Sequence, residues 1–333
     1  MSVPDETLMA HALRIADSCR SLCVDAPRTA VLVVRGGQVI AGFPGVPGPE
    51  FAWQQALDAV APGTTLVCPT PPPRDVWERL QQTPPARIVL GIAGAECAAD
   101  GFEVVAGVLQ RSCEQLNPAL VNGRPWVRMK LAMSIDGRTA LANGASKWIT
   151  GEAARADVQR WRGRSGALVT GVGTVLADDP RLNVRTGDAA IDAVARTRVV
   201  LDSAFQTPQN AVLLQGGGAE VWGLGDVPRD RPECRTVPAS EAGNVALPHV
   251  ISVLGARGCQ EILFECGAAL AGSVLGSGLL DELVVYIAPK FLGHRGRGLV
   301  ILPDYAEVPS APGMVLADSR RIGDDIRLIL ING

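Results

Sequence analysis

The chain has 333 residues, of which 47% are apolar, 20% charged and only 4% aromatic, and its formal net charge is −3. This composition suits an aliphatic-packed α/β protein and argues against a disordered or fibrous one. General nucleic-acid binding is disfavoured because no basic face stands out, and no apolar run approaches the roughly 20 residues of a membrane span. The eight cysteines are scattered without a C-x-x-C pair, which predicts a reduced, cytoplasmic compartment.

Helices and strands alternate through the first part of the chain. Apolar positions at helical spacing predict a helix over residues 5–20, and "TAVLVVRGGQVIAG" predicts a hairpin. The elements expected next are a helix over 51–60, a strand over 64–69, a helix over 74–82 and a strand over 86–93. "QLNPALVNGRPWV" then contains Asn-Pro and Asn-Gly-Arg-Pro, which predicts a domain boundary near residue 120.

A second alternating series follows this boundary. The strands expected there cover residues 127–134, 166–172, 197–203, 220–225, 261–265 and 282–289. No further strand is expected after residue 289. The expected helices cover residues 150–165, 246–256 and 268–277, with Thr150 as the N-cap of the first. Strands separated by helices predict a mainly parallel sheet that is covered on both faces, where ligands gather at the carboxyl ends of the strands.

Three polar segments fall at such strand ends. The first is "KLAMSIDGRTALANGASKWITG", and the second is "TGVGTVLADDPRLNVR", where Gly171 and Gly173 let the backbone approach a ligand closely. The third is "LFECGAALAGSVL", where free amides and the dipole at a helix start favour a phosphate. A lone G-x-G is weak evidence, and the third segment taken alone is better explained by an ordinary tight βα turn. The three segments say more together than singly.

Together these segments resemble the reductase domain of the bifunctional riboflavin-biosynthesis deaminase/reductase family. "SIDGRTA", "SKWIT" and "GTVLADDPRL" carry the resemblance, followed by "LDS" and "ECGAALAGSVLGSGLLDELVVYIAPKFLG". It implies a dihydrofolate-reductase-like α/β domain over residues 121–333, preceded by a cytidine-deaminase-like α/β domain over residues 1–120. It also implies an oxidoreductase of riboflavin biosynthesis that uses NADPH to reduce 5-amino-6-(5-phosphoribosylamino)uracil to 5-amino-6-(5-phosphoribitylamino)uracil.

The resemblance further implies which residues form the site. The positions implied for substrate binding are Ser146, Arg162, Leu182, Arg185 and Glu265. Arginines suit bidentate recognition of the ribose phosphate. Lys130 and Glu265 are the expected catalytic residues, while the proton donor stays open because bound water could serve as readily as a side chain. The positions implied for NADPH are Ala132, Trp148, Thr174, Asp178, Ser203, Gly267, Ala268, Ala269, Leu270, Ala271, Gly272 and Ser273.

Two further residues of these segments have competing interpretations. Asp136, in "SIDG", is expected to fix its own turn rather than to act in catalysis. Cys266 stands where the family usually has glycine. If that glycine has a positive φ or lies beneath the cofactor phosphates, the cysteine would weaken NADPH binding without abolishing it.

The first domain resembles a zinc deaminase that lacks its metal ligands. The family's His-Ala-Glu segment aligns with "FAWQQAL", which puts Phe51 at the histidine ligand and Trp53 at the proton-shuttling glutamate. Downstream, Cys68 has no second cysteine until Cys97. Zinc-activated water cannot be assembled without these ligands. We therefore expect an aromatic-filled pocket, no zinc, no deaminase activity and a separate deaminase elsewhere; a homodimer is implied by resemblance alone.

Two other functions remain open at this point. The chain could reduce a related pyrimidine or pteridine in a secondary pathway, although Arg162, Arg185 and Glu265 favour the phosphoribosyl substrate. Alternatively, both domains could be non-catalytic binding modules, as Cys266 and the missing zinc ligands suggest. NADPH oxidation in the presence of the deaminated phosphoribosylaminouracil separates these alternatives.

Overall fold

The computed structural model describes residues 3–93 and 101–332. It divides into two compact units, Met1–Arg124 and Pro125–Gly333, and each is described by itself. The boundary expected near residue 120 lies slightly before this division, and Cys97 lies outside the described residues. Within the described ranges, no helix is long and apolar enough to cross a membrane.

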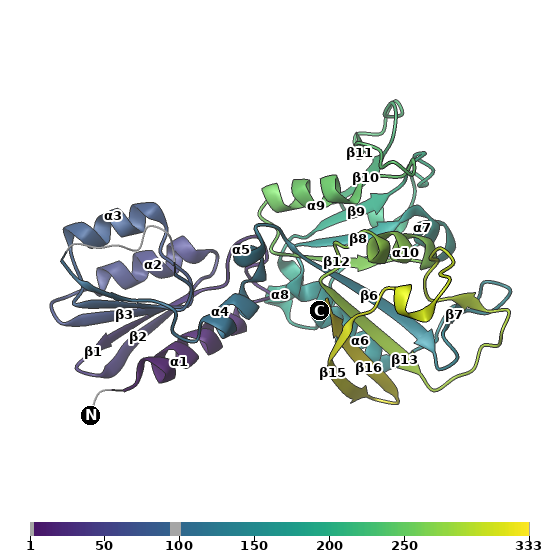
Figure 1. Cartoon of the computed structure of the whole chain (residues 1–333). Coiled ribbons are helices and arrows are strands. Elements are labelled where there is room, and N and C mark those ends of the chain that lie inside the picture. The colour runs from purple at the N-terminus through teal and green to yellow at the C-terminus, as the bar shows by residue number, and fades with distance from the viewer. Residues whose placement is uncertain (1–2, 94–100, 333) are drawn as a thin grey trace. The chain divides into compact units, whose positions relative to one another are not determined.

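The first unit is a five-stranded sheet with helices on both faces (Figure 1). Its elements are α1 (Asp5–Ser18), β1 (Ala30–Arg35), β2 (Gln38–Pro44), α2 (Pro49–Asp58), β3 (Thr64–Cys68), α3 (Arg74–Gln82), β4 (Arg87–Leu90), β5 (Glu103–Val105), α4 (Gln110–Leu116) and α5 (Pro118–Asn122). The strand order is β2-β1-β3-β4-β5, antiparallel around β1 and parallel from β3 to β5.

Side chains of successive residues in β1 point to opposite faces of this sheet. Val31 and Val33 belong to a core with α2 and α3, while Leu32 and Val34 pack with α1. Figure 1 shows α1 and the α2–α3 pair on opposite sides of the strands. The elements expected before residue 93 are confirmed, whereas β5, α4 and α5 are too short to give a periodic signal.

The second unit contains a nine-stranded sheet in the order β11-β10-β9-β8-β12-β6-β13-β16-β15. Its elements are β6 (Trp126–Ser134), β7 (Arg138–Ala140), α6 (Glu152–Arg164), β8 (Ala167–Gly171), α7 (Val172–Asp178), α8 (Ala189–Ala193), β9 (Thr197–Leu201), β10 (Ala219–Gly223), β11 (Cys234–Thr236), α9 (Leu247–Ala256), β12 (Glu261–Glu265), α10 (Ala268–Gly276), β13 (Glu282–Ala288), β14 (Arg297–Gly298), β15 (Val315–Ile322) and β16 (Asp325–Ile331). From β11 to β13 all neighbouring strands are parallel, and β16 and β15 then add antiparallel at the edge.

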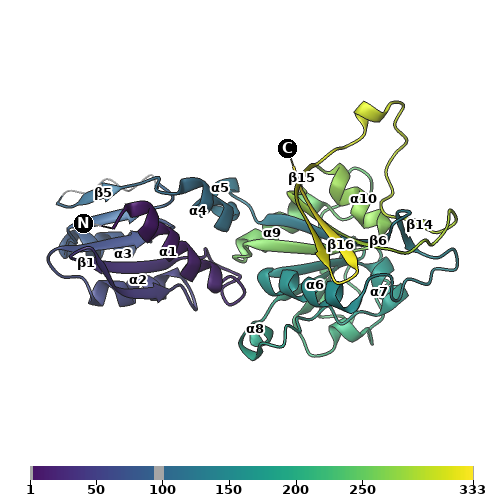
Figure 2. The ribbon, with the colours of Figure 1, turned by 90° about the horizontal axis from the view of Figure 1, so that it is seen from below.

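Both faces of the parallel part are buried by helices. Ile262 and Phe264 of β12 belong to a core that includes residues of α9 and α10, and Leu263 between them packs with α6. Figure 2 shows α6 and α10 on opposite sides of the strands. The expected doubly covered, mainly parallel sheet is confirmed.

Two details differ from the sequence-based expectation. The strands do not end with β13, because residues 315–331 form the hairpin of β15 and β16; β15 is exposed along most of its length and therefore lacks apolar alternation. Thr150 is not the N-cap of α6. That position is Gly151, whose backbone N–H donates to the Asp325 carboxylate on β16 at 2.7 Å, so a residue distant in sequence satisfies this helix start.

Candidate active site

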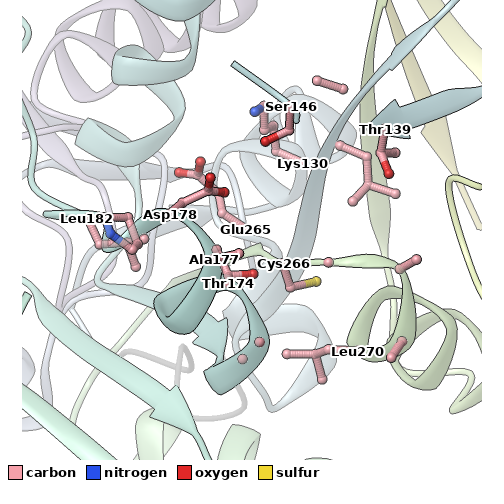
Figure 3. Close-up of a pocket in the computed structure, with 18 of the residues that line it drawn as sticks. Lys130, Thr139, Ser146, Thr174, Ala177, Asp178, Leu182, Glu265, Cys266 and Leu270 are labelled. Atoms are coloured by element: carbon pink, nitrogen blue, oxygen red, sulfur yellow. The ribbon is translucent and has the colours of Figure 1, made fainter. Parts of the chain in front are cut away.

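A pocket of about 1320 Å³ opens at the carboxyl ends of β6, β8, β9 and β12. Parallel strands bring these ends to one edge of the sheet, where their polar residues converge. Figure 3 shows Lys130 from β6, Glu265 from β12 and Thr174 from α7 around this space.

Nearly all of the residues implied by the resemblance line this pocket. They are Lys130, Ala132, Ser146, Trp148, Arg162, Thr174, Asp178, Leu182, Arg185, Ser203, Glu265, Gly267, Ala268, Ala269, Leu270 and Ser273. Ala271 and Gly272 are not among the lining residues. Ala271 is fully buried in the core, and a Cβ at Gly272 would overlap the backbone carbonyl of Ile301. The helical turn of α10 therefore directs these two positions away from the pocket.

Lys130, Glu265 and Arg162 form a charged cluster in the pocket. The parallel register of β6 and β12 places Lys130 beside Glu265. Arg162, in the last turn of α6, donates to both Glu265 oxygens, with Nε–Oε1 at 2.5 Å and Nη2–Oε2 at 3.0 Å. Both side chains of this pair are little exposed, at 12% and 13%. The cluster thus carries two cations around one carboxylate, in a poorly solvated place.

The two arginines expected to bind phosphate occupy different environments. The remaining Arg162 nitrogen, Nη1, donates to the Asn183 carbonyl at 3.0 Å, so each nitrogen of this guanidinium already holds Glu265 or the loop after α7. Arg185 is exposed at the pocket wall, and no partner of its guanidinium is found in the part of the chain that the structure describes. Arg185 is therefore the one whose charge is available to an incoming phosphate.

Burial and charge act in opposite directions on these groups. Burial lowers the pKa of Lys130, and the positive charge of Arg162 lowers it further, while the Glu265 carboxylate partly opposes both. For Glu265, burial alone would raise the pKa, but the charge and hydrogen bonds of Arg162 outweigh it and the net shift is downward. Burial raises the pKa of Cys266 to about 12, so this thiol stays protonated.

A buried polar network behind Lys130 was not foreseen from the sequence. The Lys130 ammonium lies 6.0 Å from the centre of the Tyr286 ring, within reach of a weak cation–π interaction. The Tyr286 hydroxyl accepts from Trp161 Nε1 at 2.9 Å and donates to Asp157 Oδ2 at 2.7 Å. Arg327 donates to the same Asp157 oxygen at 2.8 Å. The i, i+4 spacing of Asp157 and Trp161 on α6 was the only local signal for this network.

The walls on the far side of the pocket fit a phosphate-bearing cofactor. Among the described residues no side chain caps α10, so its first backbone amides are available beside Gly267. Gly173 is open, with nothing within 4 Å of where a Cβ would stand. Cys266 lines the pocket, but its backbone is not among the described positions with positive φ, so the strain considered for it does not arise.

Asp136 fixes a turn, as expected. Its carboxylate accepts from the Ser134 hydroxyl at 2.5 Å and from the backbone N–H groups of Leu292 and Gly293, the latter at 2.8 Å. These hydrogen bonds lower the pKa of Asp136 to about 2. The residue therefore ties the β6–β7 turn to the loop after β13.

In the first unit, the two aromatic replacements behave differently. Trp53 is fully buried in the core beside Cys68, whereas Phe51 is 44% exposed, so the expectation that both fill the former pocket is wrong for Phe51. Phe51 lies on the exposed face of α2, because Pro49, Ala52, Trp53 and Ala56 form the buried face of this helix. Cys68 Sγ lies 3.0 Å from the Thr29 hydroxyl, which in turn accepts from Thr70. No group of three or more His, Cys, Asp or Glu side chains suited to a metal occurs within the described ranges.

The doubly covered sheet of the second unit, with a pocket at the carboxyl ends of its strands, agrees with the expected α/β oxidoreductase domain of dihydrofolate-reductase-like architecture. Residues 125–328 match the RibD C-terminal domain, and the chain belongs to this family. It is 34% identical to the riboflavin biosynthesis protein RibD of Escherichia coli (strain K12), over 98% of this chain and 99% of that protein. The expected family, fold class and riboflavin-pathway oxidoreductase are thereby confirmed.

Solved structures agree over the whole chain. Acinetobacter baumannii RibD, form 1, is 30% identical with a TM-score of 0.85, covering 99% of both chains. A diaminohydroxyphosphoribosylaminopyrimidine deaminase/5-amino-6-(5-phosphoribosylamino)uracil reductase from Thermotoga maritima shares the fold, with a TM-score of 0.80 at 21% identity and 99% coverage of both chains.

Proposed function

We propose that the second unit reduces 5-amino-6-(5-phosphoribosylamino)uracil to 5-amino-6-(5-phosphoribitylamino)uracil with NADPH. The observation that carries the proposal is the Lys130–Glu265–Arg162 cluster in a large pocket that also contains the exposed Arg185. Arg185 can then bind the phosphate of the substrate, while the charged cluster binds its sugar. The alternative reductase of an unphosphorylated pyrimidine or pteridine would leave Arg185 without a role.

The reduction adds a hydride at C1′ of the ribose and a proton at the ring oxygen that leaves C1′. NADPH, when bound, supplies the hydride. Lys130 donates a hydrogen bond to the leaving ring oxygen and so places a proton where the reaction consumes one. Glu265 accepts from sugar hydroxyls with the lone pairs that Arg162 leaves unused. Arg162 acts through Glu265, whose orientation it fixes, and Arg185 binds the phosphate.

The cofactor would lie along α7, β9 and the start of α10. Thr174 and Ser203 offer hydroxyl groups there, and Gly267 leads into amide donors suited to a pyrophosphate. Ala132, Trp148, Asp178, Ala268, Ala269 and Ser273, which are also predicted cofactor positions, line the same pocket. Leu270 contributes apolar surface.

We further propose that the first unit is non-catalytic and free of zinc. Support comes from Trp53, whose buried ring occupies core space, and from Cys68, whose thiol lies against two threonine hydroxyls. A separate deaminase would then supply the substrate. Metal analysis of the purified protein tests this proposal: stoichiometric zinc, or turnover of the aminopyrimidine precursor in a deaminase assay, would contradict it.

A homodimer is also proposed. Strand β15 is an edge strand of the large sheet, and its Val315 and Leu316 are 54% and 56% exposed. Exposed apolar edge strands favour pairing with another chain. Light scattering after size-exclusion chromatography measures the mass directly, and a monomer at all concentrations would contradict this assignment.

The reductase proposal is tested by following NADPH absorbance with the phosphoribosyl substrate and with its dephosphorylated form. We expect turnover of both, with a far higher KM for the form that lacks phosphate. Equal KM values would favour the unphosphorylated alternative. An absence of both oxidation and NADPH binding would leave only a non-catalytic role.

A further inference from the structure

A second pocket lies on the opposite side of α6 from the reductase pocket. Its volume is about 460 Å³, and α6, β15 and β16 contribute its walls. The lining residues are Asp157, Arg160, Trp161, Arg164, Asp318, Arg320, Arg327 and Ile329. We call this space the α6–β16 pocket.

The helical period of α6 explains why one helix borders two pockets. Residues 157, 160, 161 and 164 follow i, i+3, i+4, i+7 spacing and line the α6–β16 pocket. Residues 155, 158, 159 and 162 form the opposite stripe and line the reductase pocket. The two pockets are therefore separated by one helix, and a ligand in one does not occupy the other.

Positive charge exceeds negative charge in this pocket. Its lining contains four arginines and two aspartates, a difference of +2. Behind the lining, Arg128 is paired with Glu261 and Glu282, which adds −1 and leaves +1 for the whole region. The net charge is therefore still positive when Arg128, Glu261 and Glu282 are included, and a positive net charge favours anions.

The two carboxylates are already shared among several donors. Asp157 accepts from Arg327 at 2.8 Å and from Tyr286, and it lies 3.7 Å from Arg160. Asp318 lies 3.1 Å from both Arg327 and Arg320. Since these carboxylates serve more than one cation each, they do not saturate the guanidinium donors of the pocket.

The four arginines differ in depth and exposure. Arg164 lies 3.8 Å from Glu261 and over the Trp161 ring, and so belongs to the inner wall. The Arg327 side chain is only 10% exposed and forms the floor, and its Nε has no hydrogen-bond partner among the described residues. Arg160 and Arg320 are 82% and 66% exposed at the mouth, where long side chains can close over a ligand. Guanidinium groups around a small concavity suit the tetrahedral oxygens of a phosphate.

We propose that the α6–β16 pocket binds a small phosphate-class anion, either inorganic phosphate or a phosphate monoester. The inference is independent of the reductase proposal, because it concerns binding on a separate face of α6. Its occupant would exchange water for charge-assisted hydrogen bonds from the exposed Arg160 and Arg320 at the mouth of the pocket.

Equilibrium dialysis with labelled inorganic phosphate at low ionic strength tests this site, and a parallel series uses glycerol 3-phosphate as the monoester. Arg320→Gln should weaken binding about tenfold, the usual effect of losing one charge-assisted hydrogen bond. Arg321→Gln is the matched control: it removes the same charge from the next residue of β15, which does not line the pocket. Its affinity should stay within about twofold of the unmodified protein.

Arg185→Ala identifies any binding in the reductase pocket. Phosphate binding that depends on Arg320 and persists in Arg185→Ala supports the proposal, and the tighter of the two probes identifies the source of the phosphate. Three outcomes overturn it: no binding, equal weakening by Arg320→Gln and Arg321→Gln, or binding lost only in Arg185→Ala. Because the readout is binding, a protein without reductase turnover can still pass this test.

Discussion

Replacing Glu265 by Gln removes the only carboxylate of the charged cluster while keeping its shape. Glu265 receives two short hydrogen bonds from Arg162, and both side chains are about nine-tenths buried. The amide can accept only one of those bonds, and its NH₂ group faces a guanidinium donor. Removing one partner of a buried ion pair costs about 3–5 kcal/mol. With the Asn183 contact retained, we expect a loss of about 2–3 kcal/mol in unfolding free energy.

The same substitution should alter the activity through Lys130. The carboxylate is the main group that opposes the lowering of the Lys130 pKa, so its loss lowers that pKa further. The ammonium form then disappears as pH rises through this lower value. The alkaline limb of kcat/KM should move to lower pH in Glu265→Gln, with a drop of about 100-fold or more at the optimum.

Urea unfolding and a pH series of NADPH oxidation measure both effects. Glu220→Gln is a suitable control, because Glu220 also forms a two-pronged pair with Arg257, at 2.7 and 3.2 Å, outside the pocket. That variant should lose about 1 kcal/mol and keep its kcat/KM. Full activity with an unmoved alkaline limb in Glu265→Gln would refute the assigned role of the cluster.

Three further predictions follow from the same geometry. Arg185→Ala should raise KM for the phosphoribosyl substrate about tenfold with little change in kcat, as measured by initial rates; an unchanged KM refutes the phosphate contact. Tyr286→Phe leaves the buried Trp161 Nε1 without its acceptor and removes one of the donors to Asp157, which keeps Arg327, and should cost about 1–3 kcal/mol in a denaturant titration; a neutral effect would mean that water replaces the hydroxyl. In the unmodified protein, the alkaline limb that depends on Lys130 should lie below the ordinary lysine pKa of 10.5, since burial lowers that pKa; a limb at or above that value contradicts the assignment.

Local sequence patterns predicted the parallel part of the fold well. Buried strands such as 261–265 and amphipathic helices such as 74–82 have strong periodic signals, and both have the bounds expected. The edge hairpin of β15 and β16 escaped because exposure along β15 removes the alternation on which strand prediction depends. In the fold, β16 pairs with β13 and β15 pairs with β16, and these long-range contacts hold the hairpin.

The sequence indicated which residues line the pocket better than it indicated which of them bond to each other. Motif order placed Lys130, Arg162 and Glu265 in one pocket. The bidentate pair of Arg162 with Glu265 joins residues 103 positions apart, so only the fold decides that this arginine serves a glutamate first. The role of Tyr286 depends in the same way on the adjacency of β13, β6 and α6.

Gly272 allows the segment with Leu299 and Ile301, which forms one wall of the reductase pocket, to pack directly on α10. The Ile301 backbone rests against Gly272, and its N–H donates to the Ala268 carbonyl at 3.0 Å, which fastens the segment with Leu299 and Ile301 to α10. Both anchoring contacts use backbone atoms of the segment, and Leu299 and Ile301 line the pocket. Substitutions of Leu299 and Ile301 should therefore change the shape of the pocket without moving the backbone of this segment. Any side chain at Gly272, in contrast, would push the Ile301 backbone, and the segment with it, away from α10.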